Sequence, residues 1–185
     1  LRKAIDEIVY LFGPNSEIMI LGRTNYDIEM LNDSHEFKIL KGREGVQLKD
    51  KRNEDLRISF MTVHKSKGLE ATNVIIINLQ NKLLGFPNKI SDDPVLSLVL
   101  TDLDVYDYAE ERRLFYVALT RTKNDTYLLV PDQHPSIFAD ELMKAYNLKF
   151  NMATGEQSIQ ANPNCPVCKT GYLVLRRNNG NGSQF

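Results

Sequence analysis

The sequence predicts an α/β fold in which a mainly parallel sheet is flanked by helices. Short apolar segments rich in β-branched residues alternate along the chain with segments whose apolar residues recur at helical spacing. One of the short segments, residues 73–79 (NVIIINL), is apolar on both faces at positions 74–77. Such a strand is typical of the centre of a parallel sheet covered by helices on both sides.

The predicted strands are short apolar runs bounded by turn-forming residues or proline. Residues 17–21 (EIMIL), for example, lie between a turn and a glycine. The same pattern predicts further strands at residues 37–40, 57–63, 73–79 and 126–130.

The predicted helices connect these strands. Residues 1–13 carry apolar side chains at helical spacing until Gly13 and Pro14, where the pattern stops. Between two of the later segments lies a long surface excursion, residues 80–104, with one short helix expected near residues 94–100. Further helices are expected at residues 24–31, 105–120 and 135–146, the last with proline in its first turn, where a missing N–H costs least.

Composition and charge limit the possible classes of protein. The chain has 185 residues, 42% of them hydrophobic, and 23 Lys and Arg stand against 24 Asp and Glu, which gives a net charge of −1. This is typical of a folded globular chain, and any affinity for nucleic acid has to come from local patches. The longest apolar run, residues 114–119, has six residues, and no signal peptide is recognisable. We therefore expect a cytoplasmic protein without a membrane span. Because the chain begins at Leu1 rather than at Met, we expect a piece of a longer polypeptide.

The first segment with candidate chemistry is residues 62–70 (TVHKSKGLE), which leave an apolar strand and enter a polar turn. Loops beyond the carboxyl ends of strands form the ligand sites of α/β sheets, and hydroxyl, imidazole and ammonium groups there can contact phosphates. A basic surface loop without a ligand fits the same residues.

The second segment is residues 110–123 (EERRLFYVALTRTK), a predicted helix with an apolar stripe and with Arg121 beyond its end. A guanidinium at this position could stabilise the charge on a transferring phosphoryl group. An ordinary surface arginine fits the position equally well.

In this order, the two segments closely resemble motifs V and VI of superfamily 1 helicases of the UvrD/Rep type. Upstream, residues 18–25 (IMILGRTN) resemble motif IV, and the similarity extends over residues 17–131. The helicase IV-like branch is the most similar, because few residues separate motifs IV and V and a Gly-Phe-Pro tripeptide follows motif V at residues 85–87.

The resemblance implies that residues 1–150 form the second RecA-like motor domain of an ATP-dependent DNA helicase. ATP and Mg²⁺ would be held mainly by a first RecA-like domain, because this chain has no GxxxxGK[ST] sequence. By match of motif, Arg23 and Arg121 are expected to reach the γ-phosphate as catalytic arginines, and Gly68 and Glu70 to lie beside the nucleotide.

The same resemblance implies a DNA-facing side of the domain. Thr62, His64, Lys65 and Ser66 are expected to face single-stranded or partly duplex DNA.

The sequence departs from the family pattern in two places. Many relatives have a tyrosine that stacks on adenine directly before the motif IV arginine, whereas this chain has Gly22. Only 38 residues separate Arg23 from Thr62, too few for the large 2B insertion of better-known family members.

The C-terminal tail has a different composition. Residues 151–164 are expected to be a linker, and residues 165–185 begin with Cys165 and Cys168 in a segment that resembles the first half of a topoisomerase-type zinc ribbon. A structural zinc site needs four ligands. We therefore expect Cys165 and Cys168 to form half of a candidate zinc site that binds metal weakly in this chain.

Other functions are compatible with the same motor. One is a helicase-nuclease subunit or an RNA polymerase-associated remodeller, although no carboxylate and lysine cluster of a nuclease is recognisable. Another is a non-catalytic DNA-binding adaptor, against which the presence of Arg23, Arg121 and Glu70 in their motif positions argues. A Walker A lysine and a DExx motif upstream would decide for the motor.

Overall fold

The computed structural model describes residues 1–31, 36–42, 45–90, 107–146 and 148, and every structural statement below refers to these residues. The chain divides into two compact units, residues 1–140 and 141–185. In the second unit the described residues are 141–146 and 148. The helix expected near residues 94–100, the linker at residues 151–164 and the half-ribbon at residues 165–185 lie outside the described residues.

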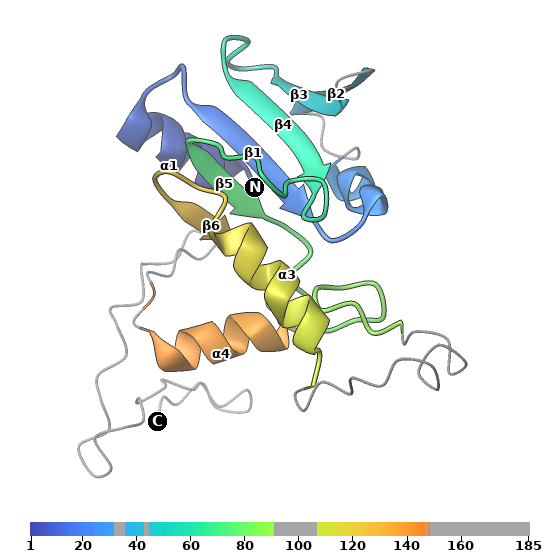
Figure 1. Cartoon of the computed structure of the whole chain (residues 1–185). Helices are drawn as coiled ribbons and strands as arrows, with labels where there is room; N and C mark the ends of the chain where they lie inside the picture. Colours follow the sequence, from blue (N-terminus) through green and yellow to red (C-terminus); the bar gives the residue numbers. More distant parts are fainter. Residues whose placement is uncertain (32–35, 43–44, 91–106, 147, 149–185) are drawn as a thin grey trace, which may run out of the picture. The chain divides into compact units, whose positions relative to one another are not determined.

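The described part of the chain contains one mixed sheet of six strands in the order β2-β3-β4-β1-β5-β6 (Figure 1). Strands β4, β1, β5 and β6 are parallel, while β2, β3 and β4 pair antiparallel. The predicted α/β fold with a mainly parallel sheet is thus confirmed. The strands are β1 (Glu17–Gly22), β2 (Phe37–Gly42), β3 (Gly45–Asp50), β4 (Arg57–Thr62), β5 (Asn73–Ile76) and β6 (Thr126–Leu128).

The described helices are α1 (Arg2–Phe12), the 3₁₀ helix η1 (Asn25–Leu31), α3 (Ala109–Leu119) and α4 (Ile137–Ala145). The helix predicted at residues 24–31 is therefore present but has the tighter 3₁₀ geometry. Strand β5 ends earlier than predicted, and Asn78, two residues later, has a positive φ of 59° that an extended strand does not allow. Strand β3 was not predicted, because its sequence GVQLKD lacks an apolar run.

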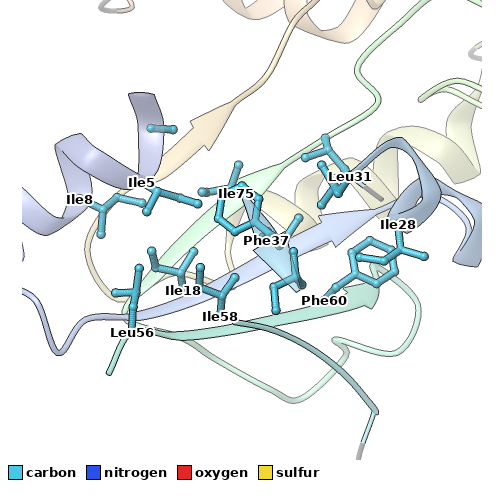
Figure 2. Close-up of a cluster of buried hydrophobic side chains, with 14 residues drawn as sticks. Ile5, Ile8, Ile18, Ile28, Leu31, Phe37, Leu56, Ile58, Phe60 and Ile75 are labelled. Carbon is cyan, nitrogen blue, oxygen red and sulfur yellow. The ribbon is translucent and has the colours of Figure 1, made fainter. Parts of the chain in front are cut away.

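The core lies between α1 and one face of the central strands (Figure 2). Ile5 and Ile8 of α1 pack in a cluster with Ile18, Ile58 and Ile75, one residue from each of three neighbouring strands. Residues that alternate with these along β1 and β5 are also buried, so the central strands are covered on both faces, as predicted.

Ion pairs of Arg2 connect the start of α1 to the antiparallel part of the sheet. The Arg2 guanidinium donates from Nη2 to Asp50 Oδ1 at 3.0 Å and from Nε to Glu36 Oε2 at 3.2 Å. It also lies 4.5 Å from the centre of the Phe37 ring. Asp50 is only 2% exposed, so this carboxylate depends on Arg2 for its compensation.

The Gly-Phe-Pro tripeptide attaches the loop after β5 to α3. The Phe86 ring is fully buried and meets Phe115 of α3 edge-on, with 5.4 Å between ring centres, and Phe138 packs on both rings. A side chain at Gly85 would place its Cβ 1.9 Å from the Gln80 carbonyl oxygen, so only glycine fits there.

Candidate functional site

The turn after β4 is built from its own backbone and hydroxyl groups. The Thr62 carbonyl accepts the N–H groups of Lys65 at 3.0 Å and Ser66 at 3.1 Å, and the Ser66 hydroxyl donates to the Val63 carbonyl at 2.8 Å. Gly68 has a φ of +82°, a conformation that favours glycine. These bonds give residues 62–68 a fixed shape.

The structure exposes only some of the residues expected to face DNA. His64 and Lys65 are exposed, whereas Thr62 is 7% exposed and Ser66 is fully buried. The reason is that short hydroxyl side chains are well suited to satisfy buried backbone groups in a turn. Ser66 and Thr62 thus shape the turn, and direct contact of the Ser66 side chain with a ligand is not available in this structure.

Arg23 lies immediately after β1, beside this turn. Gly22 is the register partner of Thr62, and the Val63 N–H donates to the Gly22 carbonyl at 2.9 Å. The Arg23 guanidinium binds Glu111 with both Nε, at 2.9 Å from each carboxylate oxygen, and Nη2, at 2.6 Å from Oε1. Arg23 and His64 therefore share the edge of the sheet at which the parallel strands end, which we call the carboxyl edge.

The electrostatics of His64 reflect this neighbourhood. Partial burial lowers the pKa of His64 below its usual value, and the positive charges of Arg23 and Lys67 lower it further, against an opposing effect of Glu111 and Glu110. The imidazole is accordingly neutral at pH 7 and carries one N–H donor.

Gly22 is required by the packing beneath it. A Cβ at this position would lie 2.8 Å from Asp27 Cβ and 3.0 Å from the Phe60 ring. A tyrosine at this position is therefore incompatible with this arrangement of Asp27.

Arg121 lies at the end of α3 and folds back along it. Its Nε donates to the Val117 carbonyl at 3.0 Å, and its Nη1 donates to the Leu69 carbonyl at 3.3 Å. Its own carbonyl accepts the Ala71 N–H at 3.0 Å, next to a bridge between Ala71 and Thr122. Gly68 and Glu70, both exposed, flank Leu69.

Arg23 and Arg121 occupy opposite edges of the sheet. The register of β1 with β5 runs from Ile18 beside Asn73 to Leu21 beside Ile76, so Ala71 aligns with a point before β1, whereas Arg23 follows its end. At ~3.3 Å per residue, Ala71 and Arg23 are about 20 Å apart along the strands. The Arg23 guanidinium pairs with Glu111 and the Arg121 guanidinium with the Val117 and Leu69 carbonyls, so the two arginines have separate partners in this structure. We call the edge with Ala71 and Arg121 the amino edge.

The residues that support this site have little signal in the sequence. Glu111 lies 88 positions from Arg23 in the sequence, and no local pattern signals such a contact. Asp27 and Asn78 are buried polar residues whose roles depend on packing around Gly22. The spacing Thr24–x–x–Asp27 is a local signal, because an aspartate can accept hydrogen bonds from a threonine three positions earlier.

Neither a metal centre nor a membrane span is found in the part of the chain that the structure describes. No group of three or more His, Cys, Asp or Glu side chains there could hold a metal ion, and no helix there is long and apolar enough to cross a bilayer. Cys165 and Cys168 lie outside the described residues.

Comparison with known proteins identifies the family. Part of the chain is 41% identical over 87 residues to DNA helicase IV of Escherichia coli (strain K12), and this match covers 47% of this chain and 13% of that protein. A match to ATP-dependent DNA helicase Rep of Buchnera aphidicola subsp. Schizaphis graminum (strain Sg) is 34% identical over 71 residues and covers 38% of this chain and 9% of that protein. The chain thus spans a small part of these relatives, and no solved structure matches it. Residues 23–132, more than half of the chain, match the UvrD-like helicase C-terminal domain, and the chain therefore belongs to that family.

Proposed function

We propose that this chain is the RecA-like C-terminal motor domain of an ATP-dependent DNA helicase or translocase. Within a longer polypeptide, it would act together with a first RecA-like domain that holds ATP and Mg²⁺. Family membership supports the motor, and the relative Rep is named an ATP-dependent DNA helicase. The observation that carries the proposal is that one loop, residues 63–70, runs from the carboxyl edge to the amino edge. It therefore links His64 to the surroundings of Arg121.

On the amino edge, Arg121 is the proposed arginine for the γ-phosphate. Its present partners are neutral oxygens, the carbonyls of Val117 and Leu69 and the hydroxyl of Thr120. A phosphate offers charged acceptors in a geometry that a guanidinium binds more strongly. Arg121 would therefore exchange these bonds for a phosphate when the two motor domains close on ATP.

Gly68 and Glu70 are proposed to lie beside the nucleotide. Both are exposed next to Leu69, whose carbonyl Arg121 contacts. The Glu70 carboxylate can accept a hydrogen bond from a ribose hydroxyl. Bound Mg²⁺ would neutralise charge between the phosphates in such a motor, with its ligands in the first domain.

On the carboxyl edge, His64 and Lys65 are proposed to contact single-stranded or partly duplex DNA. Both side chains are exposed on a turn held from inside by Thr62 and Ser66. Contacts from imidazole and ammonium groups to sugar and phosphate position a strand without reading its sequence.

The loop at residues 63–70 is the proposed coupling between the two edges. When Arg121 leaves the Leu69 carbonyl for a phosphate, the loop loses a contact at its far end. His64, at the near end, would then shift with the loop. Ligand-driven closure of this kind is a common way for nucleotide-dependent motors to pass force between sites.

The motor proposal is tested with Arg121→Ala in the complete polypeptide. DNA-stimulated ATP hydrolysis should lose on the order of 10³-fold in kcat, the scale of an arginine-finger loss. Lys123→Ala is the matched control, because Lys123 is exposed two residues later. Wild-type hydrolysis in the Arg121 variant would remove Arg121 from the nucleotide site. DNA binding by the wild type without any ATP hydrolysis would favour a non-catalytic DNA-binding or RNA polymerase-associated adaptor.

Cys165 and Cys168 are proposed as half of a zinc site that further ligands complete in the longer polypeptide. The present chain should then contain less than one tightly bound zinc per molecule, since closed sites use four ligands. Metal analysis of the purified chain checks this, and stoichiometric zinc would show that other residues of this chain complete the site.

A further inference from the structure

Arg23 is placed by the backbone at the side of the turn that carries His64. It directly follows Gly22, which is in register with Thr62 and accepts a hydrogen bond from Val63. Its positive charge contributes to the lowered pKa of His64, which shows that the two side chains are close enough to interact. A strand that contacts His64 therefore passes within reach of Arg23.

The Glu111 carboxylate binds Arg23 in an arrangement that a phosphate can also adopt. Glu111 accepts from Nε and Nη2 of the guanidinium together, the two-pronged arrangement in which arginine also binds phosphate oxygens. The pair is neither fully buried nor fully open, with Arg23 19% and Glu111 13% exposed. Part of the pair is therefore accessible to water and to a ligand.

Glu111 has a second bond that does not depend on Arg23. Its Oε2 accepts the backbone N–H of Asn88 at 3.0 Å, and it lies in the first turn of α3. A carboxylate near a helix N-terminus is stabilised by the helix dipole and the free N–H groups there. Glu111 thus keeps favourable surroundings when the guanidinium leaves it.

We propose that Arg23 is a DNA-contacting residue of the carboxyl edge and that Glu111 is its displaceable partner, whose place a DNA phosphate takes when a strand binds. This proposal rests on the assignment of the carboxyl edge to DNA. Glu111 then acts as a positioning residue that holds the guanidinium ready in the unbound state. It also sets the affinity for DNA by competing with the phosphate for Arg23.

The test measures binding of fluorescently labelled oligo(dT) to the complete polypeptide without nucleotide. Glu111→Gln should tighten binding by roughly threefold to tenfold, because it removes the competing charge but keeps the shape of the side chain. Arg23→Ala should weaken binding and reduce the slope of log K against log salt by about 0.7, the value for one lost phosphate contact on a single strand. Arg23→Lys should bind DNA with an affinity between those of the wild type and Arg23→Ala, since lysine keeps the positive charge but cannot donate two parallel hydrogen bonds.

The decisive comparison is the double variant. Glu111→Gln should have no effect on DNA affinity when Arg23 is already alanine, because its effect acts through Arg23. Glu110→Gln is the matched control, since it removes the same charge from an exposed neighbour. Equal tightening by Glu111→Gln with and without Arg23, or an unchanged salt slope in Arg23→Ala, overturns the proposal. Thermal unfolding of each variant shows that the fold is retained.

A second measurement separates this proposal from the motor proposal. Arg23→Ala should raise the DNA concentration needed for half-maximal ATP hydrolysis, whereas Arg121→Ala should lower kcat at every DNA concentration. If Arg23→Ala lowers kcat at saturating DNA as Arg121→Ala does, with unchanged DNA affinity, Arg23 serves the nucleotide and only the present proposal fails. If the wild type neither binds DNA nor hydrolyses ATP, the motor proposal fails with it.

Discussion

Asn78 donates from Nδ2 to Asp27 Oδ1 at 3.0 Å and so joins the loop after β5 to the helix after β1. Both residues are buried, and Asp27 also accepts from the N–H and the hydroxyl of Thr24, at 3.0 and 2.8 Å. The same Asp27 side chain fills the space that a side chain at position 22 would need. One buried carboxylate therefore organises the chain immediately around Arg23.

Asp27→Ala should lower the free energy of unfolding by about 2 kcal/mol, because the buried Asn78 amide and the half-buried N–H and hydroxyl of Thr24 lose their acceptor. Urea unfolding measures the loss. Glu29→Ala, two residues later on the exposed side of the same helix, is the control and should change stability by less than ~0.5 kcal/mol. Equal losses in the two variants would show that the Asp27 network contributes nothing.

Asn73→Leu should stabilise the domain by about 1 kcal/mol. Asn73 is fully buried at the start of β5, and neither its Nδ2 nor its Oδ1 has a hydrogen-bond partner among the residues that the structure describes. Leucine has a similar shape and no polar group to leave unpaired. Thermal unfolding checks the direction, and a clear loss of stability would mean that the amide has a partner that the leucine variant cannot replace.

The ion pair of Arg2 with Asp50 predicts a pH-dependent contribution to stability. Burial alone raises the pKa of Asp50, and hydrogen bonds from the Arg2 side chain and the Arg52 N–H lower it, with a net lowering below the usual 3.8. A carboxyl with a lowered pKa in the folded state stabilises the fold above the pKa of the unfolded chain. That contribution is lost as the pH falls through the folded-state value.

Arg2→Met should therefore cost about 3–5 kcal/mol at pH 7, since it leaves a buried carboxylate without its partner. The loss should be smaller at pH 3, where the carboxyl of the variant is protonated. Arg52→Met is the control, because its side chain is 66% exposed and its ion pair with Glu36 lies at the surface. A cost for Arg2→Met that does not change between the two pH values would contradict the role of Asp50.

His64 should make DNA binding more favourable as the pH falls. Its pKa lies below the usual 6.5 in the free protein, so the imidazole is neutral at pH 7, and a bound phosphate favours the protonated form. The difference in DNA affinity between wild type and His64→Ala should thus grow as the pH is lowered from ~7.5 through the lowered pKa of the imidazole. ATP affinity should change less than DNA affinity. A difference in DNA affinity that stays constant over this range would remove the imidazole from the DNA contact.

The sequence predicted much of the fold because the central elements carry strong local patterns. Residues 17–21 and 73–76 are short, apolar and bounded by turn-forming or polar residues, and α1 shows its buried stripe in the spacing of Ile5 and Ile8. β3 escaped prediction, since its polar sequence forms a strand by pairing on both sides, with β2 and with β4. The apolar spacing of residues 24–31 predicted a helix there but did not distinguish the 3₁₀ geometry of η1 from an α-helix.

What the sequence determined by itself is the order of the parallel strands and of the helices between them, the burial of the central strands and membership of the helicase family, because periodicity and motifs are local properties of the chain. Only the tertiary structure decided how the motif residues are distributed. The register of β1 with β5 separates Arg23 from Arg121, and the packing of α3 brings Glu111 to Arg23. Ser66, polar in sequence, turns inward to satisfy a carbonyl. These outcomes depend on contacts between segments far apart in the chain, and the charge or polarity of a single residue does not specify which partner it meets.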